Sequence, residues 1–231
     1  MPPARKPPAA TMPFDPARAA DYPAVIGCDE VGRGALCGPV VVAAVWFDPA
    51  SLPPALLAAL DDSKRVPEPV RARLAPLIRA QARVAVAAGS RALIDRINIR
   101  AATLDAMARA VARLGLDAPV LVDGRDALPG LPGRAVVGGD RLVPQIAAAS
   151  IVAKVFRDRM MRRLAGRHPG YGWERNVGYG TAVHRAGLTQ LGRSPHHRLS
   201  FTRAFDEPGR MGHAAQTPVR QRSRSAVSDS D

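Results

Sequence analysis

The stretch that most constrains the fold is an apolar run that ends in two adjacent acids and a glycine-containing turn. Residues 24–34 read Ala-Val-Ile-Gly-Cys-Asp-Glu-Val-Gly-Arg-Gly, so the acids are Asp29 and Glu30. The apolar part predicts a buried strand over residues 25–29. Carboxylates at the end of a core strand are costly unless a lysine, an arginine or a divalent metal ion offsets their charge. The fold must therefore bring positive charge to the end of this strand.

The other apolar patterns predict an α/β protein with a mixed sheet flanked by helices. Residues 40–47 form a second apolar run, and the short loop before it favours an antiparallel hairpin. Further strands are expected over residues 83–88, 119–122 and 134–137, and helices over 54–60, 70–81, 99–114 and 145–164. Three antiparallel strands followed by alternating helices and strands imply a mixed sheet.

The length and composition predict one folded domain between two tails. The chain has 231 residues, enough for one full core. Residues 1–20 are expected to be a disordered lead, residues 21–206 the folded body, and residues 207–231 a disordered polar tail. The sequence has no apolar run long enough to span a membrane and no signal-peptide core, so we expect a cytoplasmic protein without membrane contact.

Charge and cysteine content narrow the classes of function. The net charge of +13 suggests a polyanionic partner, most simply nucleic acid. The arginine- and alanine-rich composition is also typical of a bias in genomic base composition, so charge alone does not identify the partner.

Cys28 and Cys37 are interpreted as small buried hydrophobes, because two cysteines make neither a disulfide framework nor a good zinc site.

Acids close three of the predicted strands: Asp29 with Glu30, then Asp123, then Asp140. Sites in α/β sheets gather at strand ends, and several carboxylates together cannot all stay ionised without a partner. Mg²⁺ or Mn²⁺ fits oxygen ligands better than zinc does, and no His/Cys set accompanies these acids. The alternative is that each acid only caps or closes a turn, as Asp123 before Gly124 could do.

Neighbouring strand residues point to opposite faces of a sheet. Asp29 and Glu30 are therefore expected to share one site only if the strand breaks at this point. Gly32 and Gly34, which follow closely, make such a break plausible.

The chain is similar to ribonuclease HII, the type 2 ribonuclease H, in a series of motifs in the same order. The resemblance begins with the Asp-Glu-Val-Gly-Arg-Gly segment and spans roughly residues 24–202. The other matching segments are 62–64 (Asp-Ser-Lys), 98–107, 121–124, 139–140, 147–158, 178–184 and 197–201. So many ordered matches are far more specific than any single motif.

The resemblance implies a ribonuclease H-like fold: a five-stranded mixed sheet flanked by helices, with C-terminal helical elements. It implies an endoribonuclease that hydrolyses the RNA strand of RNA–DNA hybrids and cuts duplex DNA on the 5′ side of embedded ribonucleotides. A two-metal mechanism with Mg²⁺ or Mn²⁺ would leave 3′-hydroxyl and 5′-phosphate ends. The metal-binding and catalytic residues would be Asp29, Glu30, Asp123 and Asp140. We expect the protein to act as a monomer.

The resemblance also assigns nucleic-acid contacts. Gly32, Arg33 and Gly34 would recognise the junction between DNA and the ribonucleotide, because glycines let the backbone approach a ribose 2′-hydroxyl. Tyr179 matches the family tyrosine that stacks beside the ribonucleotide. The candidate phosphate contacts are Lys64, Lys154 and Arg198. Without the family, the Gly-Arg-Gly segment could be a surface turn and Tyr179 a core residue.

Two alternatives remain open at this level: a non-catalytic nucleic-acid-binding protein on the same fold, and the sister enzyme ribonuclease HIII. Retention of all four acids argues against pure binding, since negative charge beside a phosphate backbone opposes association. His184, His196 and His197 receive no catalytic role. The chain departs from the family pattern at Gly139 and Val177, where lysine is common, and at Pro67, where a helix-capping Ser or Thr is usual.

Overall fold

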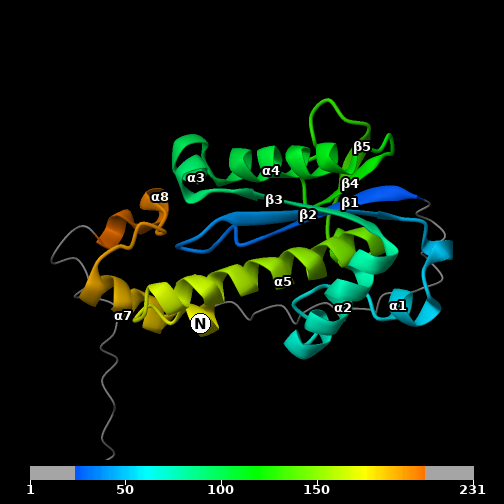
Figure 1. Ribbon diagram of the computed structural model, residues 1–231. Coiled ribbons are helices and arrows are strands. Elements are labelled where there is room, and N and C mark those ends of the chain that lie inside the picture. The colour runs from blue at the N-terminus through cyan, green and yellow to red at the C-terminus, as the bar shows by residue number, and fades with distance from the viewer. Residues whose placement is uncertain (1–23, 206–231) are drawn as a thin grey trace, which may run out of the picture.

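The computed structural model describes residues 24–205, which are built on one mixed sheet (Figure 1). Its five strands have the order β3-β2-β1-β4-β5. The strands are β1 (Val25–Val31), β2 (Val40–Phe47), β3 (Arg83–Gly89), β4 (Val120–Asp123) and β5 (Gly133–Val136). Strand β2 pairs antiparallel with β1 and β3, whereas β4 runs parallel to β1 and β5. The predicted α/β class, hairpin and mixed sheet are confirmed.

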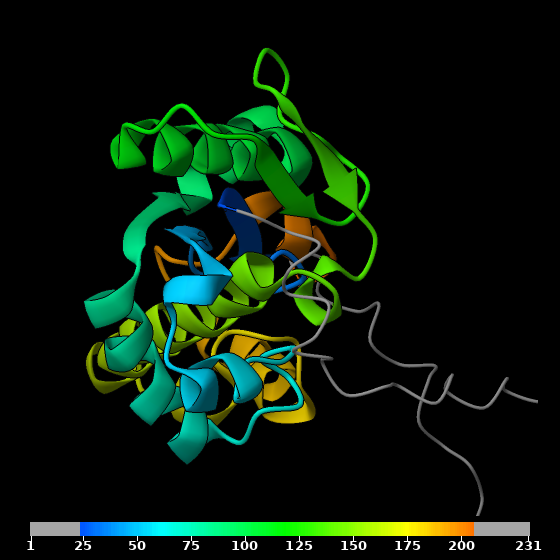
Figure 2. The ribbon, with the colours of Figure 1, turned by 90° about the vertical axis from the view of Figure 1, so that its right-hand side faces the viewer.

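Helices cover both faces of the sheet (Figures 1 and 2). On one face α5 packs against β1 and β2, with α2 and α1 beside it; on the other, α4 packs against β2 and β3, next to α3. The bounds of these helices are α1 (Pro54–Ala58), α2 (Glu68–Gln81), α3 (Arg91–Ile97), α4 (Ile99–Leu114) and α5 (Pro144–Arg167).

Short helices follow α5 at one end of the molecule (Figure 1). They are α6 (Trp173–Asn176), α7 (Ala182–Leu191), α8 (Leu199–Thr202) and the 3₁₀ turn η4 (Arg203–Phe205). These are the C-terminal helical elements that the family resemblance implied. Two other 3₁₀ turns lie earlier in the chain, η2 (Pro49–Ser51) before α1 and η3 (Gly139–Arg141) before α5, and are not among these C-terminal elements. The predicted lead (1–20) and tail (207–231), and the outermost residues of the predicted body, lie outside the described residues.

Helix α4 has the bounds predicted from its apolar spacing. Its inward face buries residues at helical intervals, among them Ala106, Met107 and Val111. The helix ends at Gly115, whose φ of 62° is a left-handed conformation that glycine adopts without strain. Helix α3 was not predicted. It is separated from α4 by Asn98 alone, whose side chain accepts a hydrogen bond from the N–H of Ala101.

Helix α5 lies unusually close to β1 because both elements carry small residues at their contact. Gly27 of β1 has no room for a side chain, since a Cβ there would overlap the backbone of Gln145. Ala147, Ala148 and Ala149 of α5 are also fully buried. This close packing fixes the N-terminal half of α5 against the strand that carries the first two acids.

Three smaller expectations can also be compared with the structure. In the part of the chain that the structure describes, no helix has the length and apolar character needed to cross a bilayer. Cys28 and Cys37 are buried free thiols, as predicted. Pro67 precedes α2 without a side-chain capping hydrogen bond, which agrees with its departure from a capping residue.

Candidate active site

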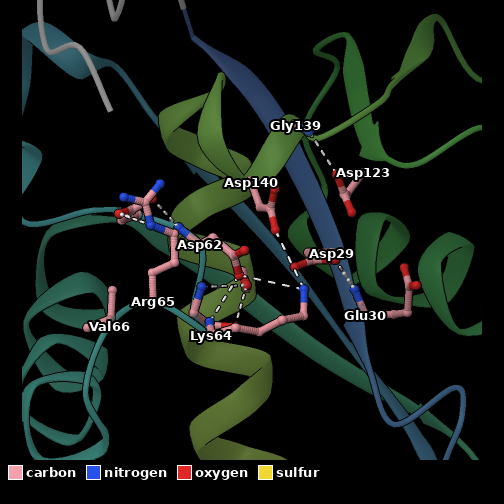
Figure 3. Close-up of polar contacts among 12 residues, drawn as sticks. Asp29, Glu30, Asp62, Lys64, Arg65, Val66, Asp123, Gly139 and Asp140 are labelled. Atoms are coloured by element: carbon pink, nitrogen blue, oxygen red, sulfur yellow. Dashed lines mark hydrogen bonds and ion pairs between the residues drawn. The ribbon is translucent and has the colours of Figure 1, made fainter. Parts of the chain in front are cut away.

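Parallel pairing of β1 and β4 brings the first and third acids together. The register aligns Cys28 with Val122, so Asp29 and Asp123 are the next residues along two neighbouring strands. Asp123 is the last residue of β4, as predicted, and Asp29 lies near the end of β1. The carboxyl groups of both residues therefore lie at the same end of the sheet, where Figure 3 shows them.

Asp140 reaches this site from a 3₁₀ turn rather than from a strand end. Strand β5 ends at Val136, and Asp140 lies in the following turn η3. The N–H of Gly139 donates a 2.8 Å hydrogen bond to Oδ1 of Asp123, which fixes the turn against β4 (Figure 3). The third acid thus helps to place the fourth.

Glu30 lies on the opposite side of β1 from Asp29, because the strand does not break between them. Regular pairing with β2 continues through Val31, so the expected break is wrong. Glu30 lines a pocket with Arg33 and Asp123, whereas Asp29 faces Lys64 (Figure 3). In the described part of the chain, the four acids accordingly do not form a set with all ligand atoms within 4.8 Å of one another.

Burial and mutual repulsion disfavour the charged state of three of these acids. Burial, followed by the charges of Glu30 and Asp123, raises the pKa of Asp29 well above its usual range. Burial also raises the pKa of Glu30, although the ion pair of its carboxylate with Arg33 at 3.4 Å opposes that shift. Burial and the charges of Asp123 and Asp62 raise the pKa of Asp140 to about 6.

Lys64 supplies positive charge beside Asp140, as Arg33 does beside Glu30. The Lys64 Nζ lies 3.8 Å from Asp140 and 3.6 Å from Asp62 (Figure 3). Burial alone would lower the pKa of Lys64, but the surrounding carboxylates of Asp62 and Asp140 raise it. These two exposed cations cannot neutralise four carboxylates, so negative charge remains in excess.

The donor set fits a divalent cation. It consists of carboxylate oxygens, the ligands that Mg²⁺ and Mn²⁺ prefer. A cation among these carboxylates would favour the charged forms of Asp29 and Asp140 and so oppose the effects of burial and repulsion that raise their pKa values. The residues present are therefore suited to hold such an ion.

The glycine-rich loop and Tyr179 lie side by side, although they are far apart in the sequence. A Cβ placed on Gly34 would have Tyr179 Cε1 as its nearest neighbour, at 4.0 Å. Arg33 and Gly34 are exposed, and Tyr179 is half-buried. The Arg157 guanidinium lies 5.6 Å from the centre of the tyrosine ring. Of the predicted recognition residues, Arg33, Gly34 and Tyr179 thus lie together next to Glu30, whereas Gly32 is buried against Arg157.

The other predicted phosphate contacts differ in their surroundings. Lys154 of α5 pairs with Asp158 at 2.9 Å, and its side chain is mostly buried. Arg198 is fully buried, and its guanidinium donates to the backbone oxygens of Gly32, Arg33 and Gly38. A direct phosphate contact is not open to Arg198 in this arrangement, because all three of its nitrogens face the protein interior.

Two of the histidines form a buried pair. Nε2 of His184 lies 3.0 Å from Nε2 of His197, and Nδ1 of His184 lies 2.9 Å from the backbone oxygen of Tyr179. The Ser194 N–H donates to Nδ1 of His197, so that the neutral His197 carries its proton on Nε2. Burial lowers the pKa of His197 to about 4. The ring nitrogens of both histidines thus make hydrogen bonds inside the protein, which agrees with a structural interpretation of these residues.

Sequence reasoning gave no role to Asp62 or Arg157, which the structure places at this site. Asp62 lies beside Lys64 and raises the pKa of Asp140. Arg157 is fully buried under the loop that starts at Gly32. Asp62 belongs to the matched Asp-Ser-Lys motif and Arg157 to the matched Arg-Asp motif. Their place in these motifs was the sequence feature from which a role at the site could have been predicted.

Comparisons with known proteins agree with this geometry. The family model "Ribonuclease HII" matches residues 26–204. Ribonuclease HII of Rhodospirillum rubrum is 58% identical over 182 residues, which cover 77% of this chain and 83% of that protein. The protein of the same name from Paramagnetospirillum magneticum is 56% identical over 180 residues, covering 77% and 89%.

Solved structures show the same fold. RNase HII of Archaeoglobus fulgidus, solved in a complex with PCNA, superposes with a TM-score of 0.66 and 28% identity over 79% of this chain and 97% of that one. Bst-RNase HIII in complex with Mn²⁺ gives a TM-score of 0.61 and 21% identity, with 80% and 69% covered. At that identity, the second likeness concerns the fold alone.

Proposed function

This chain belongs to the ribonuclease HII family, and from that premise we propose that it cuts RNA–DNA hybrids and duplex DNA on the 5′ side of embedded ribonucleotides. As a family member it is an endoribonuclease, a hydrolase that acts on nucleic acid and depends on a divalent metal ion. The proposal adds the substrate, the position of the cut, the ion (Mg²⁺ or Mn²⁺) and the residues responsible.

The position of Asp123 is the observation that carries the proposal. Its charge acts on Asp29, Glu30 and Asp140, and its carboxylate holds the turn that bears Asp140. A fold gains no stability from collecting repelling carboxylates at one strand end. The arrangement is explained if these four acids hold divalent ions at the point of phosphodiester hydrolysis.

When bound, a pair of divalent ions would supply an activated water and stabilise the oxygen that leaves. The chain's own residues prepare the site for this chemistry. Asp29, Glu30, Asp123 and Asp140 would be the ligands. Lys64, whose ammonium group is next to Asp140, would attract and orient the phosphate that enters this negative site.

The exposed loop beside the acids would select the ribonucleotide. Gly34 leaves open space next to Tyr179, so the backbone can approach a sugar closely. The Tyr179 ring would stack on the neighbouring nucleotide, and the exposed guanidinium of Arg33 would contact a phosphate. A 2′-hydroxyl held by the loop backbone would distinguish RNA from DNA.

A cleavage assay on matched duplexes tests this proposal. One duplex carries a single ribonucleotide, and the other has the same sequence in DNA alone. We expect cutting of the first duplex only, on the 5′ side of the ribonucleotide, with Mg²⁺ or Mn²⁺ and not with EDTA. Equal cutting of both duplexes would remove the proposed role of the loop, and cutting in EDTA would remove that of the acids.

Two finer expectations stay predictions. The monomeric state is checked by the molar mass of the full chain in solution, with and without the duplex. A non-catalytic binding protein on this fold would bind the hybrid without cutting it under any metal condition, and the same assay detects that outcome.

A further inference from the structure

Two buried arginines hold the connection between β1 and β2. Arg198 donates to the backbone oxygens of Gly32, Arg33 and Gly38 at 2.7–2.9 Å. Arg157 donates to those of Cys37, Pro39 and Val177 at 2.9–3.2 Å. Five of these six oxygens belong to the connection over residues 32–39. Two buried guanidinium groups therefore hold the backbone of this connection by hydrogen bonds.

Stability alone does not explain this arrangement. Both side chains are fully buried, and burial lowers the pKa of each guanidinium. Burial and then the charge of Arg157 lower the pKa of Arg198 to about 10. Buried charges rarely add net stability, because the cost of removing them from water is large. The six hydrogen bonds of the pair fix the position of the backbone that they contact.

The bonds of Arg198 determine where two peptide N–H groups point. In a planar trans peptide the N–H points away from the C=O of the preceding residue. The oxygens of Gly32 and Arg33 face the buried Arg198, so the N–H groups of Arg33 and Gly34 face outward. Among residues 24–205, neither of these N–H groups donates a hydrogen bond to another protein group.

We propose that Arg198 is a positioning residue for ribonucleotide recognition: it fixes the two outward N–H groups of Arg33 and Gly34 as a preformed donor pair for the 2′-oxygen of the ribonucleotide. This inference rests on the proposed function of the glycine-rich loop. Because the two donors are already fixed, little conformational entropy is lost when substrate binds. A loop whose peptide groups could rotate would lose more with each substrate.

Arg198 immediately precedes α8 and is held against the β1–β2 connection by the C-terminal elements. The chain before α8 pairs with the β1–β2 connection through the Cys37–His197 bridge, and α8 lies beside this connection (Figure 1). Phe201 packs its ring 5.1 Å from the guanidinium of Arg198. The selectivity of the loop therefore depends on residues about 165 positions further along the chain.

The variant Arg198→Lys tests the proposal, because lysine keeps the charge and loses the planar fork of donors. The KM for the duplex with one ribonucleotide is measured together with the inhibition constant of the matched all-DNA duplex as competitor. We expect the KM to rise about tenfold or more, while the inhibition constant changes little. A merely structural defect would weaken both affinities together.

Arg109→Lys is the matched control. Arg109 of α4 also donates to a backbone oxygen, that of Ala88, but lies on the other face of the sheet from α5. The KM and the inhibition constant of the Arg109→Lys variant should match those of the wild type. If the wild type itself does not prefer the ribonucleotide duplex, the proposed function fails. If the wild type prefers it and Arg198→Lys keeps that preference, the role of Arg198 is overturned.

A second measurement needs only the wild-type chain, in case Arg198→Lys does not fold. The probe is the nicked product duplex, which keeps the ribonucleotide on the 3′ side of the cut and resists further cutting. We expect this duplex to slow hydrogen exchange at the N–H groups of Arg33 and Gly34 by about tenfold or more, relative to a nicked duplex without the 2′-hydroxyl. Equal exchange with both duplexes would overturn the proposal.

Discussion

The ammonium group of Lys64 lies 3.8 Å from the carboxylate of Asp140, at the exposed edge of a site with excess negative charge. The side chain of Lys64 is 79% exposed and that of Asp140 is 7% exposed, so the lysine is the member of the pair that substrate can reach. This pair joins the loop after α1 to the turn after β5, two segments that are distant in sequence.

Replacing Lys64 by glutamine should weaken substrate use more than it weakens the fold. Removal of the exposed charge should reduce kcat/KM by roughly tenfold, and the loss should shrink as salt concentration rises, because screening weakens the attraction that Lys64 provides. Steady-state cleavage at several salt concentrations measures this. Arg65→Gln, next to Lys64 but paired with Asp61, is the control. Equal losses in the two variants would contradict a specific role for Lys64.

Asp29→Asn should abolish cleavage and leave binding to the hybrid largely intact. The same change should stabilise the metal-free protein, because it replaces a carboxyl group whose ionised form is disfavoured by burial and by the charges of Glu30 and Asp123. A gain of about 1 kcal/mol would raise the Tm by roughly 2–4 °C in EDTA. Cleavage, hybrid binding and thermal unfolding are measured on one preparation. Unchanged turnover would count heavily against Asp29 as a metal ligand.

Divalent ions should stabilise the wild type through the four acids. At an Mg²⁺ or Mn²⁺ concentration about 100 times the Kd, mass action adds roughly 2.7 kcal/mol to the free energy of unfolding. Thermal unfolding with rising ion concentration should show an increasing Tm for the wild type. The increase should be much smaller for Asp123→Asn, since Asp123 acts on all three other acids. An equal increase in both proteins would place the bound ion elsewhere.

Acid should destabilise the protein through His197. Burial holds its folded pKa near 4, below the ordinary value of 6.5, so below pH 6.5 the unfolded chain binds a proton that the folded chain does not. The contribution of His197 is thus complete above pH 6.5 and is lost as pH falls toward 4, at about 1.4 kcal/mol per pH unit.

Denaturant unfolding of wild type and His197→Gln between pH 4 and 8 measures this slope. The variant cannot take up the proton, so its free energy of unfolding should depend less steeply on pH between 6.5 and 4. Parallel pH curves for the two proteins would show that His197 titrates alike in the folded and unfolded chains.

Local patterns in the sequence determined much of the fold. Alternating and continuous apolar runs located all five strands, and helical spacing with Gly115 located α4. The short turn between the first two runs predicted their antiparallel pairing. These features depend on residues near one another in the chain, so the pattern carries the physical cause. Helix α3 was missed because one residue, Asn98, separates it from α4.

The sequence by itself also identified the four acids, since each follows or ends an apolar run. Only the tertiary structure decided how they meet: parallel register set Asp29 beside Asp123, and an unbroken strand sent Glu30 to the other face. It likewise decided that Arg198 is buried beneath Gly32 and Arg33 rather than exposed to a phosphate. An arginine reads the same in sequence in either place, because its burial depends on packing between segments far apart in the chain.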